Sequence, residues 1–377
     1  MDFDLTDEQQ ATSELAAKLL GDKATPDAIR ALEQRDDLRV DRDLWAALAG
    51  AGLLGIAVPA QHGGAGLGML ELCLLLEEVG RRTAPVPALA TLALGALPVA
   101  RWGTAAQQAA LLPGVVNGTT LLTAALSEPT GDPRRPTTTA RPGGAGGWVL
   151  DGTRSNVPAG LVADVILVPA TTPGGDAGLF AVPSGAAGLR RDRQDTTTGT
   201  PEALVVLDGV QVGDDAVVGP LDPGGTTLAW TVEHATVAAC AVMSGLAAEA
   251  VRITGEYATG REQFGRPIAT FQAVGQRAAD AYVDAQAIRL TMLQAAWRLG
   301  AGAPSDREVA VAKYWAAAGG QRVVHAASHL HGGVGVDRDY PLHRYFLLAK
   351  QLELFLGGAS RQLVALGAIL AAEGPLR

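Results

Sequence analysis

Hydrophobic residues recur at three- and four-residue spacing in roughly the first and last thirds of the chain, a pattern typical of helices with one buried face. Thr6 and Gln9 match the two ends of a capping box, so a helix is expected to begin there. It would carry Leu15, Leu19 and Leu20 on or near one face. Further helices are expected at 41–52, 69–82 and 104–112.

The pattern changes between residues 121 and 222, where short apolar runs are bounded by Gly, Pro, Asp and Thr. Such runs are typical of strands in an all-β module. They lie at 121–126, 147–150, 164–168, 178–182 and 203–207. The stretch 130–142, rich in Pro, Thr and Arg, is expected to be an exposed loop.

Long helical patterns follow, and helices of this kind pack as a bundle. They cover 226–259, 271–299, 305–331 and 342–372. The chain is therefore expected to have an α+β fold with three parts. These are an N-terminal helical domain (1–120), a small central β-barrel or β-sandwich domain (121–225) and a C-terminal four-helix bundle (226–377).

Composition limits the class of protein. Of 377 residues, 48% are hydrophobic and 18% are charged, so the chain can bury large cores. The formal net charge of −9 argues against nucleic-acid binding, which needs Lys and Arg to neutralise phosphates. The acidic start at 1–4 does not match a signal peptide, and no uninterrupted apolar stretch reaches membrane-spanning length. We therefore expect a cytoplasmic protein without a membrane segment.

Metal and disulfide chemistry are not expected. Cys73 and Cys240 lie in apolar runs without a CxxC pattern. His325 and His329 have the i, i+4 spacing of metal ligands, but no Glu or Cys completes a set. The glycine-rich segment 63–68 lacks both the GxGxxG spacing and a preceding strand, which favours a turn between helices.

Two segments could bind a ligand. Residues 261–272 contain a Gly/Pro turn between two helices, where free N–H donors and Arg261 could bind a pyrophosphate. The alternative is an ordinary helix connection with surface arginines, and the residues alone leave both open. The close glycines Gly332, Gly333 and Gly335 allow a ligand to approach the backbone, or form a helix cap and loop.

Taken together, these segments resemble the acyl-CoA dehydrogenase family, and the resemblance covers essentially the whole chain. The family pattern Arg-x-x-Phe-Gly…Phe-Gln is matched by Arg261, Phe264, Gly265, Phe271 and Gln272. The Gly-Gly-x-Gly loop is matched by Gly332, Gly333 and Gly335, with Pro-Leu-His-Arg following at 341–344. The opening MDFDLTDEQQ, the stretch GIAVPAQHGGAG and Ser127-Glu128-Pro129 are similar to other family landmarks.

The resemblance implies a flavin enzyme in which a glutamate removes the α-proton of an acyl thioester and FAD accepts the β-hydride. It also implies that FAD lies near a subunit interface, where one subunit holds the ADP half of its neighbour's FAD. By this resemblance the cofactor-binding residues here are Arg261, Phe264, Gln272, His329, Gly332, Gly333 and Gly335.

The chain departs from the family at the positions that carry the chemistry. Leu356 stands where the family has its catalytic glutamate, and Ala235 occupies the other position that some members use. Glu233 is the one candidate base nearby, although it lies about 200° around the helix from Ala235. Pro158 replaces the Thr or Ser that bonds the flavin ring, and His329 replaces a glutamine.

These departures resemble the non-catalytic subunit of bacterial heterotetramers in the family, some of which act on sterol-derived CoA thioesters. The hypothesis is an FAD-dependent acyl-CoA dehydrogenase subunit that lacks the base and works with a second family subunit in an α2β2 complex. Its expected partners include an acyl-CoA substrate and an electron-transfer flavoprotein. The alternatives are a homomeric acyl-CoA or acyl-carrier dehydrogenase with Glu233 as a displaced base, and a scaffold without redox function.

Overall fold

The computed structural model describes residues 5–35, 38–129, 131–144 and 146–373, so the acidic start at 1–4 lies outside the described residues. Helices precede residue 117, the strands of the large sheet run from 122 to 222, and from 226 the chain is helical apart from a short hairpin at 262–267. This order confirms the predicted α+β class. The chain folds into two compact units, residues 1–28 with 73–84 and 236–377, and residues 29–72 with 85–235. The domain boundaries at 120 and 225 stay a prediction.

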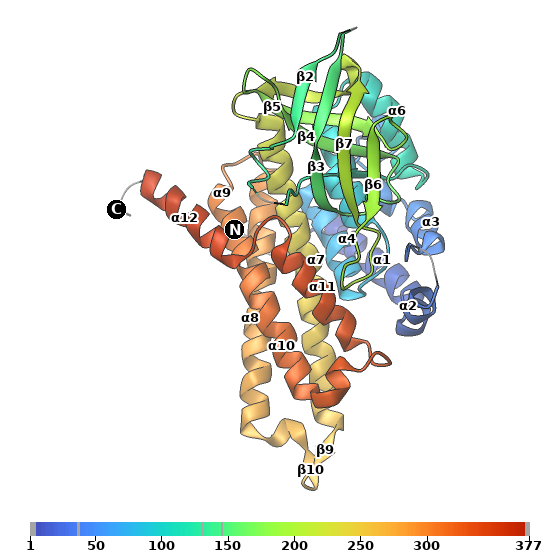
Figure 1. The fold of residues 1–377 in the computed structure, drawn as a ribbon. Helices are drawn as coiled ribbons and strands as arrows, with labels where there is room; N and C mark the ends of the chain where they lie inside the picture. The colour runs from blue at the N-terminus through green and yellow to red at the C-terminus, as the bar shows by residue number, and fades with distance from the viewer. Residues whose placement is uncertain (1–4, 36–37, 130, 145, 374–377) are drawn as a thin grey trace. The chain divides into compact units, whose positions relative to one another are not determined.

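The unit that contains residues 85–235 combines short helices with the β-sheet (Figure 1). Its helices are most of α2 (Pro26–Glu33), α3 (Arg42–Gly50), η1 (Leu53–Gly55), η2 (Ala60–His62), the π-helix η3 (Leu89–Ala96), α5 (Leu97–Trp102), α6 (Ala105–Val116) and η4 (Asp214–Ala216). The first residues of α4 (Met69–Arg81) and of α7 (Thr226–Gly260) also belong here. The helices predicted at 41–52, 69–82 and 104–112 are confirmed by α3, α4 and α6.

Within the described residues eight strands form one sheet, in the order β6-β7-β3-β2-β4-β5-β8, with β1 pairing β4. The strands are β1 (Leu122–Ala124), β2 (Thr139–Pro142), β3 (Trp148–Val157), β4 (Val165–Thr171), β5 (Ala177–Pro183), β6 (Leu189–Arg193), β7 (Ala203–Val212) and β8 (Val217–Asp222). The five predicted apolar runs became β1, β3, β4, β5 and β7. Their inward residues, including Leu150, Ile166, Val168 and Phe180, form the core of the sheet.

The expectation of an exposed loop at 130–142 is wrong in its last part. Residues 139–142 form β2, which pairs antiparallel with β3 and buries Ala140 completely. The other side chains of β2 are exposed, so the segment lacks the apolar run by which a strand is recognised in a sequence. It forms a strand because it pairs with β3.

An ion pair lies inside this sheet unit. The Arg154 side chain on β3 is fully buried, and its Nη1 lies 2.8 Å from Oε1 of Glu128, whose side chain is 3% exposed. Glu128 also accepts hydrogen bonds from the Thr137 backbone N–H (2.7 Å) and hydroxyl (2.9 Å). Burial lowers the pKa of Arg154 to about 10, and the Glu128 charge opposes this shift. The Ser127-Glu128-Pro129 landmark thus anchors the chain that leads into β2.

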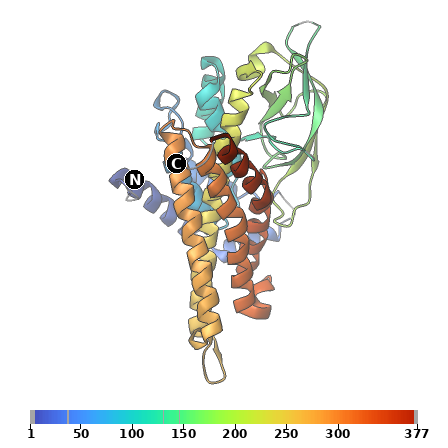
Figure 2. The same cartoon turned by 90° about the vertical axis from the view of Figure 1, so that its left-hand side faces the viewer.

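The other unit is helical and contains α1 (Asp7–Lys23), most of α4 and of α7, α8 (Gln272–Gly300), α9 (Asp306–Tyr314), the π-helix η6 (Trp315–Gly319), α10 (Gly320–His331), η7 (Gly332–Val336), α11 (Leu342–Leu354) and α12 (Ala359–Glu373). Helices α7, α8, α10 and α11 run side by side (Figures 1 and 2). The predicted capping box is confirmed, since Thr6 accepts from the Gln9 backbone N–H and Gln9 from the Thr6 N–H. Cys73 and Cys240 are both buried, and neither forms a disulfide among the described residues.

Helices α4 and α7 cross at two glycines. A Cβ on Gly80 would lie 1.9 Å from the Val242 carbonyl oxygen, and one on Gly245 would lie 1.7 Å from the Glu77 carbonyl oxygen. Neither position can hold a side chain without moving the backbones apart. At this crossing the buried Glu77 carboxylate accepts hydrogen bonds from Ser244 (2.9 Å) and Arg289 (3.0 Å).

The predicted single helix over 342–372 is wrong, because it is broken between α11 and α12. Leu356 and Gly357 adopt positive φ angles of 55° and 100°. The last carbonyls of α11 are satisfied by a buried lysine, since Lys313 Nζ donates to the Leu352 oxygen at 2.6 Å and to the Glu353 oxygen at 3.3 Å. Burial lowers the pKa of Lys313 to about 8. Its contacts from α9 hold the end of α11 in place.

Two helical stretches of the described chain are long and apolar enough to cross a membrane by length and composition alone. In 226–260 the apolar window is 78% buried, as in the core helix of a globular protein, but in 342–372 it is only 6% buried.

Replacing Arg154 by Met should destabilise the sheet unit strongly, because Glu128 would remain buried without its cation. Breaking a buried ion pair in this way costs about 3–5 kcal/mol. The free energy of unfolding can be measured by urea denaturation followed by circular dichroism. Arg190→Met is the control, since that arginine's side chain is 66% exposed beside Asp192 and its pair should contribute less than about 1 kcal/mol. Equal losses in the two variants would contradict the assignment.

Candidate functional site

The turn after α7 projects beyond the ends of the helices (Figure 1). It is a small hairpin of β9 (Glu262–Gln263) and β10 (Arg266–Pro267), followed by η5 (Ile268–Thr270). At its tip Phe264 has a φ of 55° and is 93% exposed. The Arg266 guanidinium lies 4.3 Å from the centroid of the Phe271 ring and braces the base of the hairpin. The hairpin therefore presents a large aromatic ring to the outside.

The glycine loop is tied to the last turns of α7 by aromatic residues. The His331 ring stacks on Tyr257 at 4.3 Å, and its Nε2 lies 3.2 Å from the Tyr340 hydroxyl. Its Nδ1–H donates to the Ala327 carbonyl at 2.8 Å. Tyr257 is one helical turn before Arg261, so these contacts bring the loop that begins at Gly332 to the same end of the bundle as the hairpin.

Sequence reasoning missed Tyr257 and Tyr340 as the residues that hold this loop. Tyr257 lies 74 residues from His331 in the sequence, and its hydroxyl donates to the His331 carbonyl at 3.4 Å. Such a contact leaves no local pattern in the sequence. One signal was available in the sequence. His331 and Tyr340 are only 9 residues apart and flank the glycine loop.

The predicted glycines fall into two groups. Gly332 ends α10 with a φ of 62°, and a Cβ on Gly332 or Gly333 would meet nothing within 4 Å. A ligand could therefore approach the backbone there. Gly335 is buried, and a Cβ on it would lie 2.8 Å from the Ser328 carbonyl oxygen. Its role in the fold is close packing against α10.

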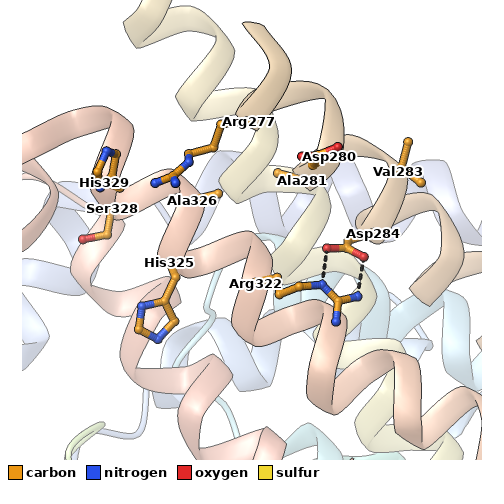
Figure 3. Close-up of a pocket in the computed structure, with 10 residues that line it drawn as sticks. All are labelled: Arg277, Asp280, Ala281, Val283, Asp284, Arg322, His325, Ala326, Ser328 and His329. Carbon is orange, nitrogen blue, oxygen red and sulfur yellow. Dashed lines mark hydrogen bonds and ion pairs between the residues drawn. The ribbon is translucent and has the colours of Figure 1, made fainter. Parts of the chain in front are cut away.

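A groove of about 780 Å³ lies between α8 and α10, and His329 lines it (Figure 3). Arg277 and His329 lie near one another, and His325 points away from them. Farther along, Arg322 and Asp284 form a two-point ion pair with N–O distances of 2.8 and 2.5 Å. The groove lining is Arg277, Asp280, Ala281, Val283, Asp284, Arg322, His325, Ala326, Ser328 and His329.

The predicted cofactor residues suit the ADP half of a dinucleotide. Arg261, Phe264, Gln272 and His329 are all exposed. In the part of the chain that the structure describes, the Arg261 guanidinium has no hydrogen bond or ion pair. A guanidinium can bind two phosphate oxygens, and an exposed aromatic ring can stack on a base. The open backbone at Gly332 and Gly333 adds room for a phosphate group.

The position of the family's base holds no carboxylate. Leu356 is 7% exposed and lies in the left-handed turn after α11. The nearby carboxylate of Glu353 is 2.6 Å from Lys350 Nζ. The Leu356 side chain cannot accept a proton, and the Glu353 carboxylate is held in an ion pair with Lys350.

Glu233 on α7 lies in an ion pair. Its Oε1 is 3.1 Å from Nη2 of Arg134, which comes from the loop before β2. Ala235, the position used by some family members, is fully buried. A base role for Glu233 stays a prediction, and this geometry gives the carboxylate a structural role between α7 and the loop.

The segment expected to face a flavin ring does not suit it. Pro158 has no N–H, and its carbonyl already accepts the Thr123 hydroxyl at 2.6 Å. Asn156 and Ala159 have positive φ angles of 49° and 53°. The adjacent Asn156 N–H donates to the Gln194 side chain. No group of three His, Cys, Asp or Glu suitable for a metal is found among the described residues, and the expected lack of a metal stays a prediction.

Comparison with known proteins gives full-length matches. Residues 6–119 match the model described as acyl-CoA dehydrogenase, N-terminal domain, and residues 223–370 match acyl-CoA dehydrogenase, C-terminal domain. The chain is 40% identical to acyl-CoA dehydrogenase FadE27 of Mycobacterium tuberculosis, over 98% of this chain and 99% of that protein.

Two solved structures are similar over almost the whole chain. One is described as the ChsE4-ChsE5 complex from Mycobacterium tuberculosis, with 41% identity, a TM-score of 0.93 and all of both chains covered. The other is described as a Tcur3481-Tcur3483 steroid ACAD variant, with 46% identity, a TM-score of 0.91, and 97% of this chain and 98% of that chain covered.

His234, the residue that follows Glu233, should make the free energy of unfolding depend on pH. Its ring stacks on Trp230 at 3.7 Å and is buried, and burial lowers its pKa to about 4. The unfolded chain has a histidine pKa of about 6.5, so it takes up the proton first as the pH falls. Stability is full above pH 6.5 and is lost progressively toward pH 4, by about 3 kcal/mol for this group.

Urea denaturation at several pH values checks this expectation. His234→Phe should flatten the loss of stability between pH 6.5 and 4. The control His325→Phe changes an exposed histidine and should keep the loss. An unchanged pH profile in His234→Phe would contradict the role of this ring.

Proposed function

Because the chain belongs to the acyl-CoA dehydrogenase family, we propose that it is the base-lacking partner in an α2β2 enzyme that dehydrogenates an acyl-CoA thioester. One contrast carries the proposal. The residues suited to the ADP half of FAD are exposed at one end of the bundle, while the base position holds the buried Leu356.

In this proposal the chain holds a cofactor that serves the active site of its partner. FAD supplies the acceptor for the β-hydride of the thioester. Arg261 neutralises the pyrophosphate, and Phe264 packs against the nucleotide from the hairpin tip. Gly332 and Gly333 leave room for the backbone to contact phosphate oxygens. The contacts of His331 with Tyr257 and Tyr340 keep this loop in place before the cofactor arrives.

The proposed partner is a second chain of the same family that carries the catalytic glutamate and a Thr or Ser at the flavin ring. Two observations support it. The similar structures are described as a ChsE4-ChsE5 complex and as a Tcur3481-Tcur3483 steroid ACAD. The ring-side segment of this chain has Pro158 in place of a donor. We propose a steroid-derived acyl-CoA as substrate and an electron-transfer flavoprotein as electron acceptor.

The two alternative functions predict different properties of the purified protein. A homomeric dehydrogenase would use Glu233 as its base, so the chain purified alone would be a yellow oligomer that oxidises acyl-CoA. A scaffold without redox function would assemble with its partner in a complex that lacks FAD. The ion pair between Glu233 and Arg134 favours the heteromeric proposal over the first of these alternatives.

Arg261→Ala should weaken FAD retention in the co-expressed complex. Removing a charge-assisted contact to the pyrophosphate costs about 1.5–3 kcal/mol, which corresponds to roughly 10- to 100-fold in Kd. The flavin-to-protein ratio and the Kd for FAD by fluorescence quenching are the readouts. Arg141→Ala, in an arginine of β2 whose side chain is 58% exposed, is the control and should retain FAD. An unchanged Kd in Arg261→Ala would contradict the cofactor role.

Glu233→Gln should leave kcat of the complex unchanged, because the partner supplies the base. The homomeric alternative expects a loss of about 10²-fold or more, as for removal of a general base. Steady-state oxidation of an acyl-CoA by the purified complex distinguishes the two. The same change at the partner's family glutamate is the positive control and should abolish turnover.

A further inference from the structure

Helix α12 is covered by its own chain on one side only. It packs on α9 and η6, and extends away from the other helices of its unit (Figure 1). Ten of its 15 residues are hydrophobic. On the outer side Leu363 is 51% exposed, Val364 is 74% exposed and Leu370 is 38% exposed. Leu354, just before the turn that leads into α12, is 65% exposed.

These residues form one continuous apolar strip. Leu363, Val364, Gly367, Leu370 and Ala371 are spaced i, i+1, i+4, i+7 and i+8, so they share one face of the helix. The window that includes them has a mean hydropathy of 1.5 and is only 6% buried. Monomeric proteins rarely leave so large an apolar surface in water, so the strip indicates a binding surface.

The strip does not fit a membrane-spanning helix. Helix α12 has 15 residues, which span about 22 Å, whereas the hydrocarbon core of a bilayer is about 30 Å thick. The turn at Leu356 and Gly357 separates α12 from α11, so the two helices do not form one continuous span. The strip has the length of a helix-packing surface.

We propose that this strip, which we call the α12 face, docks a helix of the second acyl-CoA dehydrogenase chain. The inference rests on the proposed heteromeric function and adds the surface that joins the chains. The similar chain described as part of the ChsE4-ChsE5 complex aligns over 100% of this chain, so the similarity extends through α12. A partner helix also buries the apolar side chains that this chain leaves exposed.

The centre of the α12 face admits a close helix contact. A Cβ on Gly367 would meet nothing within 4 Å in this chain. Along this face Leu363 and Val364 lie about one turn before Gly367, and Leu370 lies about one turn after it. Small residues between larger ones let a second helix approach closely while the larger side chains pack beside it. A bulky residue at Gly367 would therefore disturb the partner without disturbing this chain.

Gly367→Leu is the sharpest test. In the isolated chain it replaces a poor helix former by a good one and meets open space, so the melting temperature should stay the same or rise. In the co-expressed complex it should weaken binding of the partner at least 10-fold. Val364→Glu, at the most exposed of these sites, should weaken binding similarly by placing a charge in an apolar contact. Partner affinity is measured by biolayer interferometry and the assembly mass by light scattering.

Leu15→Glu is the matched control, since Leu15 on α1 is 43% exposed outside the α12 face and should keep full affinity. A wild-type heteromer that both α12 variants leave intact overturns the α12 face but leaves the proposed function standing. A wild-type chain that forms no heteromer overturns the proposed function as well. A homodimer broken by Gly367→Leu, or flotation of the wild-type chain with phosphatidylcholine and phosphatidylglycerol vesicles, overturns the choice of occupant.

Discussion

The helical unit depends on the close crossing of α4 and α7. Gly80 and Gly245 each face a backbone carbonyl of the other helix at a distance that excludes any side chain. The crossing also places Glu77 where Ser244 and Arg289 can donate to it, so the buried carboxylate is compensated. With α7 fixed here, its far end has a defined position, and that end carries the hairpin with the exposed aromatic tip.

The residues proposed to hold the cofactor and the position proposed for the base lie in separate segments of the helical unit. The residues suited to an ADP group belong to a hairpin and a glycine loop, and both are anchored by contacts that do not involve the ligand. Tyr257 stacks on His331 at 4.3 Å, and Arg266 braces Phe271. The base position has an apolar side chain in a turn, and Lys313 fixes the helix end that leads into it. Under the proposed function, the lack of a base therefore need not disturb the segments that would hold a nucleotide.

Two exposed features have one physical explanation. Phe264 is 93% exposed at a positive φ, and the outer side of α12 is apolar and open. Each would be unfavourable in an isolated molecule, because apolar surface in water raises the free energy of the folded state. A second subunit would cover both, the first through a shared cofactor and the second directly. This agrees with the proposal that the chain functions within a heteromeric complex.

The sequence alone determined the order of helices and strands and the capping box at Thr6, because periodicity and capping are local properties. The assignment of Leu356 to the base position came from the family resemblance and stays a prediction. The sequence could not identify β2, whose strand form requires β3, or the break between α11 and α12, which Lys313 stabilises from another helix. The ion pair between Glu233 and Arg134 joins residues that are 99 positions apart in the sequence. Only folding brings such groups together, so only the tertiary structure decided their partners.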